Sequence, residues 1–444
     1  MTGRSVLRRY LVVSFLTWLP VGLMMPVMVL LMTSRGLSLA QVGLVTTVFS
    51  AVTIALELPT GGLADVVGRR KVLALSAGFT VAALVMMAMS TTVWMFLVTG
   101  VLKGVARALS SGPATSWYVD TLHEIEGRDA DLKPGLARGG AMESAALCLG
   151  VLAGGFVPLL LGPGGPILPL AEPLLRPGGP ISPLAVPPLL GAVAAVVLLV
   201  VVVLAMPEPS HARRSLGGVL REVPRTVAGG LRMAVRGALL RRLMLAAAAS
   251  GVALAAVELL TPGRLAELAG TAELGGAAYA VVAALGFAGS AAGSSIAPWA
   301  ARAAGGSARG AAAGAVLTAL SIGGLAATAG LDGVAGLASA GLAYVVMFAG
   351  LGVAGMLCLE MTHNAVTAAQ RNTVTSTSSL SLQAGAGLSN LGFGALATSA
   401  GMAAAWSVAA GLVLVSALLF ARMPALGARE TAPVPLEAGQ RPAG

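Results

Sequence analysis

Charged residues are scarce in this chain of 444 residues. Only 10% are Asp, Glu, Lys or Arg, whereas 57% are hydrophobic and the mean hydropathy is +0.88. Soluble domains carry about 25% charged and about 45–50% apolar residues, so the composition excludes an ordinary soluble fold. A chain of this kind keeps its apolar surface in lipid, where each membrane-crossing helix uses roughly 20 apolar residues. The length leaves room for twelve such helices and their loops.

Cysteine, histidine and aromatic residues are also few. The two cysteines, Cys148 and Cys358, lie in apolar runs, so we expect buried reduced thiols and no disulfide framework. The three histidines are scattered without the spacing of metal ligands. Neither a nucleotide-binding P-loop nor a convincing nucleophile elbow is present, so we expect no metal, no cofactor and no enzymatic activity. The aromatic content of 4% disfavours a site that stacks sugars.

Apolar runs account for most of the sequence, six of them before and six after a polar stretch at 207–240. They are continuous, unlike the alternating strands of a membrane β-barrel. We therefore predict an all-α integral membrane protein with 12 transmembrane helices in two pseudo-symmetric six-helix bundles. The first run ends near residue 32 and is too long for a signal peptide. The others lie near 40–62, 72–91, 93–117, 139–162, 184–206, 241–261, 274–298, 310–330, 333–358, 373–397 and 401–421.

The basic residues alternate in number from loop to loop. If the N-terminus is inside, the inner segments hold 23 Lys and Arg, and the outer segments hold only Arg35, Arg176 and Arg264. Cytoplasmic loops carry such an excess, so we expect both termini in the cytoplasm. The net charge of +10 then reflects topology rather than nucleic-acid binding. The abundance of Ala, Gly, Val, Arg and Pro is typical of a GC-rich bacterial gene, which indicates the inner membrane.

Four segments follow from these patterns. We expect an N-terminal bundle at 1–206, a basic cytoplasmic linker at 207–240, a C-terminal bundle at 241–421 and a disordered cytoplasmic tail at 422–444. The linker can lie as an amphipathic helix on anionic lipid. A proline-rich tandem repeat occupies 163–190, where it cannot form a regular helix. It is interpreted either as a duplicated loop without a role or as a lid over the transport path.

The stretch 57–71, between the second and third runs, carries the most specific motif. It reads Glu-Leu-Pro-Thr-Gly-Gly-Leu-Ala-Asp-Val-Val-Gly-Arg-Arg-Lys and resembles the signature loop of the major facilitator superfamily. Val66 departs from the usual basic residue. The resemblance implies a latch between the two halves that holds the outward-facing state; a role in topology alone is the other interpretation. The latch residues would be Gly61, Asp65, Gly68, Arg69 and Arg70.

Two basic residues lie inside the fourth run. Arg107 resembles the arginine of the family's fourth-helix motif, which is tied to proton transfer in antiporters, although its spacing to Gly112 is one residue longer than usual. Lys103 lies one turn away on the same helix face. A charge inside a span costs about 2.5–3.5 kcal/mol on insertion scales and indicates function. A structural pairing of Arg107 with a nearby acid is the alternative.

Few acidic residues lie where they can serve proton coupling. Glu57 and Glu143 are the leading candidates, and Glu258 is a third. A carboxyl group in a low-dielectric site can take up and release a proton near neutral pH, and an interfacial or salt-bridged carboxylate is the competing interpretation. Asn390 and Gln383, in the eleventh run, are candidates for residues that line the cavity.

The resemblance implies a secondary active transporter that works by alternating access around one cavity near the bilayer midplane. An apolar cavity with few charges favours proton-coupled efflux of small lipophilic or weakly cationic compounds, such as drugs or secondary metabolites. Uptake of a small metabolite is one alternative, and a non-transporting membrane receptor or integral enzyme is another. The expected partners are a small-molecule substrate, protons and the lipid bilayer; no nucleic acid is expected, and no oligomer is required.

Overall fold

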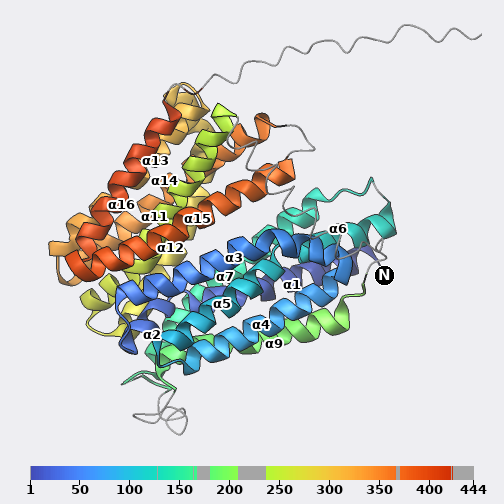
Figure 1. The fold of residues 1–444 in the computed structure, drawn as a ribbon, viewed down its shortest axis with the longest axis horizontal. Coiled ribbons are helices and arrows are strands. Elements are labelled where there is room, and N and C mark those ends of the chain that lie inside the picture. Colours follow the sequence, from blue (N-terminus) through green and yellow to red (C-terminus); the bar gives the residue numbers. More distant parts are fainter. Residues whose placement is uncertain are drawn as a thin grey trace, which may run out of the picture.

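The computed structural model places the described part of the chain in long helices that form two bundles (Figure 1). The described residues are 2–127, 129–163, 165–167, 181–208, 237–366, 371–421 and 423. The expected linker at 207–240, the tandem repeat at 163–190 and the tail at 422–444 therefore lie largely outside the described residues.

The first bundle contains the first six spans, two of which are broken into two helices. Its elements are α1 (Gly3–Met24), α2 (Met28–Ser34), α3 (Leu39–Val67), α4 (Arg69–Met89), α5 (Val93–Ser110), α6 (Pro113–Glu126), α7 (Lys133–Leu161), η1 (Pro183–Ala185) and α9 (Val186–Ala205).

The second bundle contains the other six spans. Its elements are α11 (Ala238–Ala269), α12 (Ala272–Ala304), α13 (Ser307–Ala327), η2 (Thr328–Gly330), α14 (Gly333–Asn364), α15 (Arg371–Ala400), α16 (Met402–Ser416) and η4 (Ala417–Phe420).

Eleven spans of the described chain are long and apolar enough to cross a membrane. The remaining one, α15, has 30 residues but carries many hydroxyl and amide side chains. It packs between α3 and α11, where protein shields part of its surface from lipid. The prediction of an all-helical membrane fold is therefore confirmed.

Proline and glycine explain the breaks between consecutive helices. Pro26 lies in the turn between α1 and α2, because proline lacks an N–H and clashes with the preceding helical turn. Gly112, with a φ of 98°, separates α5 from α6, and Pro113 occupies the first turn of α6. Gly68, with a φ of 105°, is the single non-helical residue between α3 and α4. The motif at 57–71 is thus mostly helical rather than the loop that we expected.

Several helices continue past the apolar runs. The seventh span was expected to end near residue 261, yet α11 extends to Ala269. Arg264, which we assigned to an outer loop, therefore lies inside a helix and is only 8% exposed. Its guanidinium donates hydrogen bonds to the carbonyl oxygens of Thr328 (3.0 Å), Ala329 (3.3 Å) and Leu331 (2.6 Å). These bonds satisfy the end of the neighbouring span, which is why a charged residue is tolerated there.

The bundles meet at one end and diverge at the other (Figure 1). We call the end that holds the N-terminus and Gly68 the basic end, and the end that holds Ser38 and Gly401 the far end. The largest buried apolar cluster lies toward the far end and combines residues of both bundles. Three further clusters of the described residues lie toward the basic end, and each belongs to one bundle alone. The described structure is therefore closed at the far end.

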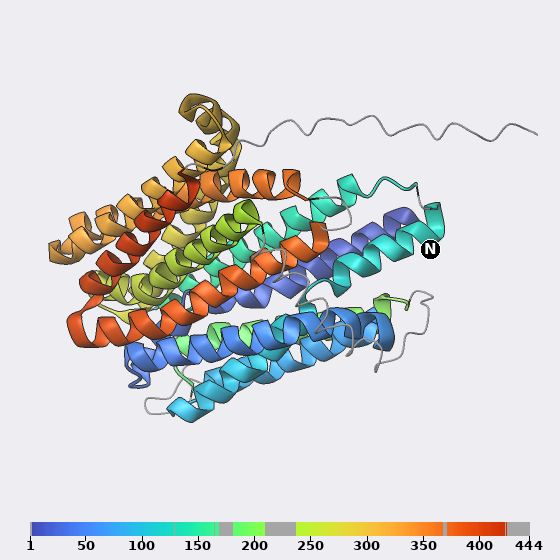
Figure 2. The same ribbon diagram turned by 45° about the horizontal axis from the view of Figure 1, so that its top comes forward.

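Close helix contacts produce this closure. The views in Figures 1 and 2 show α3 and α15 side by side. Thr47 donates a hydrogen bond to the carbonyl oxygen of Gly387 at 2.7 Å, and the hydroxyl of Thr398 accepts one from the amide of Ala40 at 3.1 Å. A Cβ atom at Gly43 would overlap the backbone of α15. On the opposite side of the seam, α7 and α12 approach through glycines in the same way.

Candidate functional site

The first bundle contains a charged cluster to which four of its helices contribute. Arg107 on α5 interacts electrostatically with Glu57 on α3 and Glu143 on α7. Its guanidinium lies 4.7 Å from the ring centroid of Trp18 on α1, and the indole is also a neighbour of Glu143. The structure therefore brings three of the sequence-predicted residues together. We call these three residues, together with Trp18, the Arg107 cluster.

The Glu57 carboxylate of the Arg107 cluster is only partly satisfied by hydrogen bonds. One oxygen of Glu57 accepts a hydrogen bond from the hydroxyl of Ser111 at 3.4 Å, and its other oxygen is buried without a hydrogen-bond partner. With both acids ionised, the two carboxylates and Arg107 carry one net negative charge. One added proton neutralises these described side chains, which is the arrangement that a proton-binding site needs.

Lys103 lies one helical turn from Arg107 on α5. Its ammonium contacts the sulfur of Met28 at 3.3 Å and lies 5.3 Å from the ring centroid of Phe49. Its electrostatic partner is Glu258 on α11 of the other bundle. The structure thus places Lys103 and Glu258, which are far apart in sequence, on opposite sides of the seam between the halves.

Glu258 is exposed although it lies deep in a membrane-length helix. Because its neighbours include Lys103 of the other half and the buried Tyr279 and Tyr344, the carboxylate faces open space inside the protein rather than lipid. We call this the central space. The two tyrosines meet edge to face with centroids 5.9 Å apart, and their hydroxyls lie 3.4 Å apart.

The motif between α3 and α4 makes its described contacts within the first bundle. Arg69 forms an ion pair with Asp120 and donates to the carbonyl oxygen of Ser116, both on α6. Arg70 donates to the carbonyl oxygen of Val203 on α9. Gly61 and Asp65 lie on α3, and the Asp65 side chain lies outside the described residues. The latch between halves therefore stays a prediction, and the arginines hold α4 to its own bundle here.

Asn390 and Gln383 both lie on α15, which runs along the seam between the halves. Asn390 is at the closed far end, where its backbone oxygen faces Gly43. Gln383 lies about two turns nearer the middle and is half-buried. A role of either side chain in lining the cavity stays a prediction.

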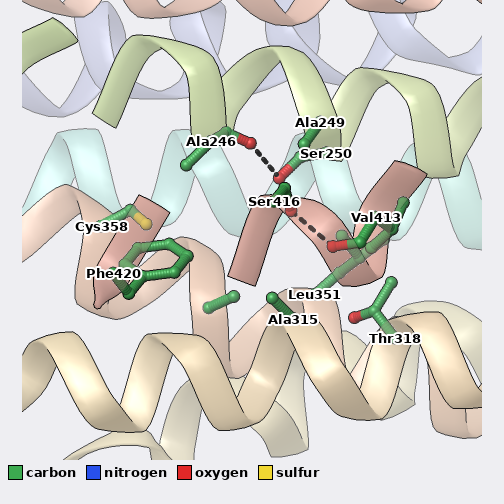
Figure 3. Close-up of a pocket in the computed structure, with 11 residues that line it drawn as sticks. Ala246, Ala249, Ser250, Ala315, Thr318, Leu351, Cys358, Val413, Ser416 and Phe420 are labelled. Carbon is green, nitrogen blue, oxygen red and sulfur yellow. Dashed lines mark hydrogen bonds between the residues drawn. The ribbon is translucent and has the colours of Figure 1, made fainter. Parts of the chain in front are cut away.

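A separate small cavity lies wholly inside the second bundle, between α11, α13, α14 and α16 (Figure 3). Its volume is about 20 Å³, and a buried water needs roughly 10–15 Å³. Its polar wall consists of Ser250, Thr318 and Ser416, each of which donates to a backbone carbonyl of its own helix. The cavity fits one water molecule and is too small for an organic substrate.

Sequence reasoning missed the aromatic and thioether residues around the charges: Trp18, Met28, Phe49, Tyr279 and Tyr344. Each is a single residue in an apolar run, where it gives no periodic signal. The scarcity of aromatic residues offered one usable clue, because four of the few present lie beside charged groups of the interior.

Comparison with known proteins agrees with this architecture. The family model of the Major Facilitator Superfamily matches residues 10–362, while no curated protein matches the chain by sequence. A solved structure of the nucleoside transporter NupG has a TM-score of 0.71 and 12% identity, covering 94% of this chain and 98% of that one. The D-xylose-proton symporter gives 0.70 and 13%, covering 96% and 98%.

A bacterial homolog to the human lysosomal transporter Spinster, in an inward-facing and occupied conformation, gives a TM-score of 0.71. It is 15% identical, and the match covers 94% of this chain and 95% of that chain. Identities this low show the fold alone. The family match over most of the chain carries the assignment further: this multi-pass membrane protein belongs to the major facilitator superfamily and is a secondary transporter rather than an enzyme.

Proposed function

We propose that this transporter exports small lipophilic compounds in exchange for protons. The observation that carries the proposal is the separation of two charged sites. The Arg107 cluster lies within one bundle and has one net negative charge, whereas Lys103 and Glu258 face each other across the central space. The first site can hold a proton without occupying the second, which leaves the central space for the substrate.

Alternating access gives the exchange its direction. The described structure is closed at the far end by α3 with α15 and by α7 with α12. If the basic end is cytoplasmic, as the basic loops predict, this state receives substrate from the cytoplasm of a bacterial cell. Rocking of the halves about the central space then releases substrate at the far end. Protonation of Glu143 or Glu57 would weaken their attraction to Arg107 and so bias the two states.

Whole-cell accumulation of labelled lipophilic compounds, with and without a protonophore, tests the export. Expressing cells should accumulate less of at least one compound, and the protonophore should abolish the difference. Energised uptake instead of export would reverse the proposed direction and favour a small-metabolite importer. The absence of any energised flux across a broad panel would contradict the proposal.

A matched pair of variants tests the proton site. Glu143→Gln keeps the shape of the side chain and removes its titration, so exchange driven by a pH gradient in proteoliposomes should fall at least tenfold. Glu126→Gln alters an exposed carboxylate at the end of α6 and should retain it. Equal proton-driven flux in both variants would remove Glu143 from the coupling mechanism. Arg107→Ala should abolish flux while leaving membrane insertion intact.

A further inference from the structure

Two opposite charges face the central space without a direct ion pair between them. Lys103 belongs to the first bundle and Glu258 to the second, and the two side chains interact electrostatically. The contacts that Lys103 does make, with the sulfur of Met28 and the ring of Phe49, are weak substitutes for an anion. Charges inside a membrane protein are costly unless they are paired or reach water, a substrate or an ion.

The position of these charges explains why they stay apart. Lys103 and Glu258 each lie roughly 15 Å along their helices from the far end, at 1.5 Å per residue. The halves are closed at that end, and the exposure of Glu258 shows open space beside it. With the far end closed, the two charges therefore lie near enough to interact electrostatically but do not form a direct ion pair.

The charge balance selects the kind of molecule that fits between them. A simple cation would pair with Glu258 and leave Lys103 unpaired, and a simple anion would do the reverse. A molecule with both charges pairs with both groups and adds no net charge to a balanced site. Met28 and Phe49, both half-buried, lie beside Lys103, which suits an apolar body. Tyr279 and Tyr344, near Glu258, are fully buried, so they pack around the site without exposing surface to a ligand.

We infer that the lipophilic substrate is also a zwitterion: its apolar or aromatic body carries an anionic group that binds Lys103 and a cationic group that binds Glu258. This inference rests on the proposed function only in assigning the central space to the substrate. Because one ligand then contacts both bundles, its binding stabilises the protein and joins the halves during the transition. The Arg107 cluster, one turn away on α5, remains free for the proton.

The test is direct binding to the purified full-length protein, measured by calorimetry and by the ligand-induced rise in melting temperature. The probes are phenyl-substituted amino acids in which one to five carbons separate amine and carboxylate. Each is matched with its amide, which is a cation, and with its deaminated acid, which is an anion. At least one zwitterion should bind at least tenfold more tightly than both matched relatives at pH 7.

Variants assign each charge to its partner. In Glu258→Gln the zwitterion should lose its advantage over the deaminated acid, and in Lys103→Gln it should lose its advantage over the amide. The control Lys71→Gln changes an exposed lysine at the start of α4 and should change neither ratio. Unliganded melting and gel-filtration profiles check folding. If either single variant unfolds, the charge-swapped Lys103→Glu/Glu258→Lys protein should recover the preference for the zwitterion.

Preference for the amides across the series would overturn the inference in favour of a cationic substrate, and preference for the acids in favour of an anionic one. A series in which no zwitterion exceeds its relatives would also overturn it. These outcomes are separate from failure of the proposed function, because binding needs neither a proton gradient nor a direction of flux. A zwitterion preference without energised export would refute export and leave the substrate class standing.

Discussion

The glycine contacts at the far end make a quantitative prediction about the conformational equilibrium. A Cβ atom at Gly394 would lie 3.1 Å from the Cα of Ala40 and would overlap the carbonyl oxygen of Leu39. Because backbone atoms cannot yield as a flexible side chain does, Gly394→Ala should force α3 and α15 apart. Overpacking of this kind costs about 1–3 kcal/mol, which corresponds to a change of about 5- to 150-fold in an equilibrium constant. The substitution is expected to favour the state that is open at the far end.

Distance measurements between spin labels can detect that change. The labels belong at Ser34 and Ser399, which are exposed at the far end of the two halves, in a background where Cys148 and Cys358 are serines. Gly394→Ala should increase the population with the longer distance. The matched control is Gly392→Ala on the same helix, where a Cβ meets nothing within 4 Å. An equal distance distribution in the two variants would refute the reasoning that glycine packing closes this end.

Three further substitutions test how the bundles are held together. Arg264→Ala removes hydrogen bonds from a charged donor to three carbonyl oxygens and should lower the free energy of unfolding by about 1.5–3 kcal/mol, measured against the exposed control Arg309→Ala; equal losses would argue against the capping role. Gly68→Ala forces a side chain into a φ of 105° and against the carboxylate of Glu208, so the melting temperature should fall. Adding Glu208→Ala should recover only part of that loss, and full recovery would mean that the φ carries no strain. Trp117→Phe loses a 2.8 Å hydrogen bond from the indole to the carbonyl oxygen of Pro207 and should cost about 1 kcal/mol by thermal unfolding, whereas no change would mean that water replaces the bond.

The positions of the spans could be predicted from the sequence, because membrane-crossing helices are continuous apolar segments of nearly fixed length. Their ends could not, since polar residues prolong a helix wherever a neighbouring segment satisfies them. Arg264 illustrates this, because the three carbonyl oxygens to which it donates lie more than sixty residues away in the chain. The run containing α15 was identified as apolar from the sequence, although it is less apolar than the other spans.

The candidate site was less predictable than the fold. The charged residues inside the spans stand out in the sequence because each is costly in lipid. Which of them meet depends on packing: Arg107 gathers Glu57 and Glu143 from its own bundle, whereas Lys103, one turn away, faces Glu258 of the other. Nothing in the spacing of these residues along the chain distinguishes the two environments. The aromatic residues around them could be assigned only from the structure.

Paired distances at the two ends of one protein test alternating access most directly. One pair of spin labels is Ser34 with Ser399 at the far end, and the other is Ala141 on α7 with Ala303 on α12 at the basic end. When Gly394→Ala lengthens the first distance, rigid rocking of the halves predicts that the second shortens in the same proportion of molecules. If the far end opens while the basic-end distance stays unchanged, the result would contradict alternating access, in which one end closes as the other opens.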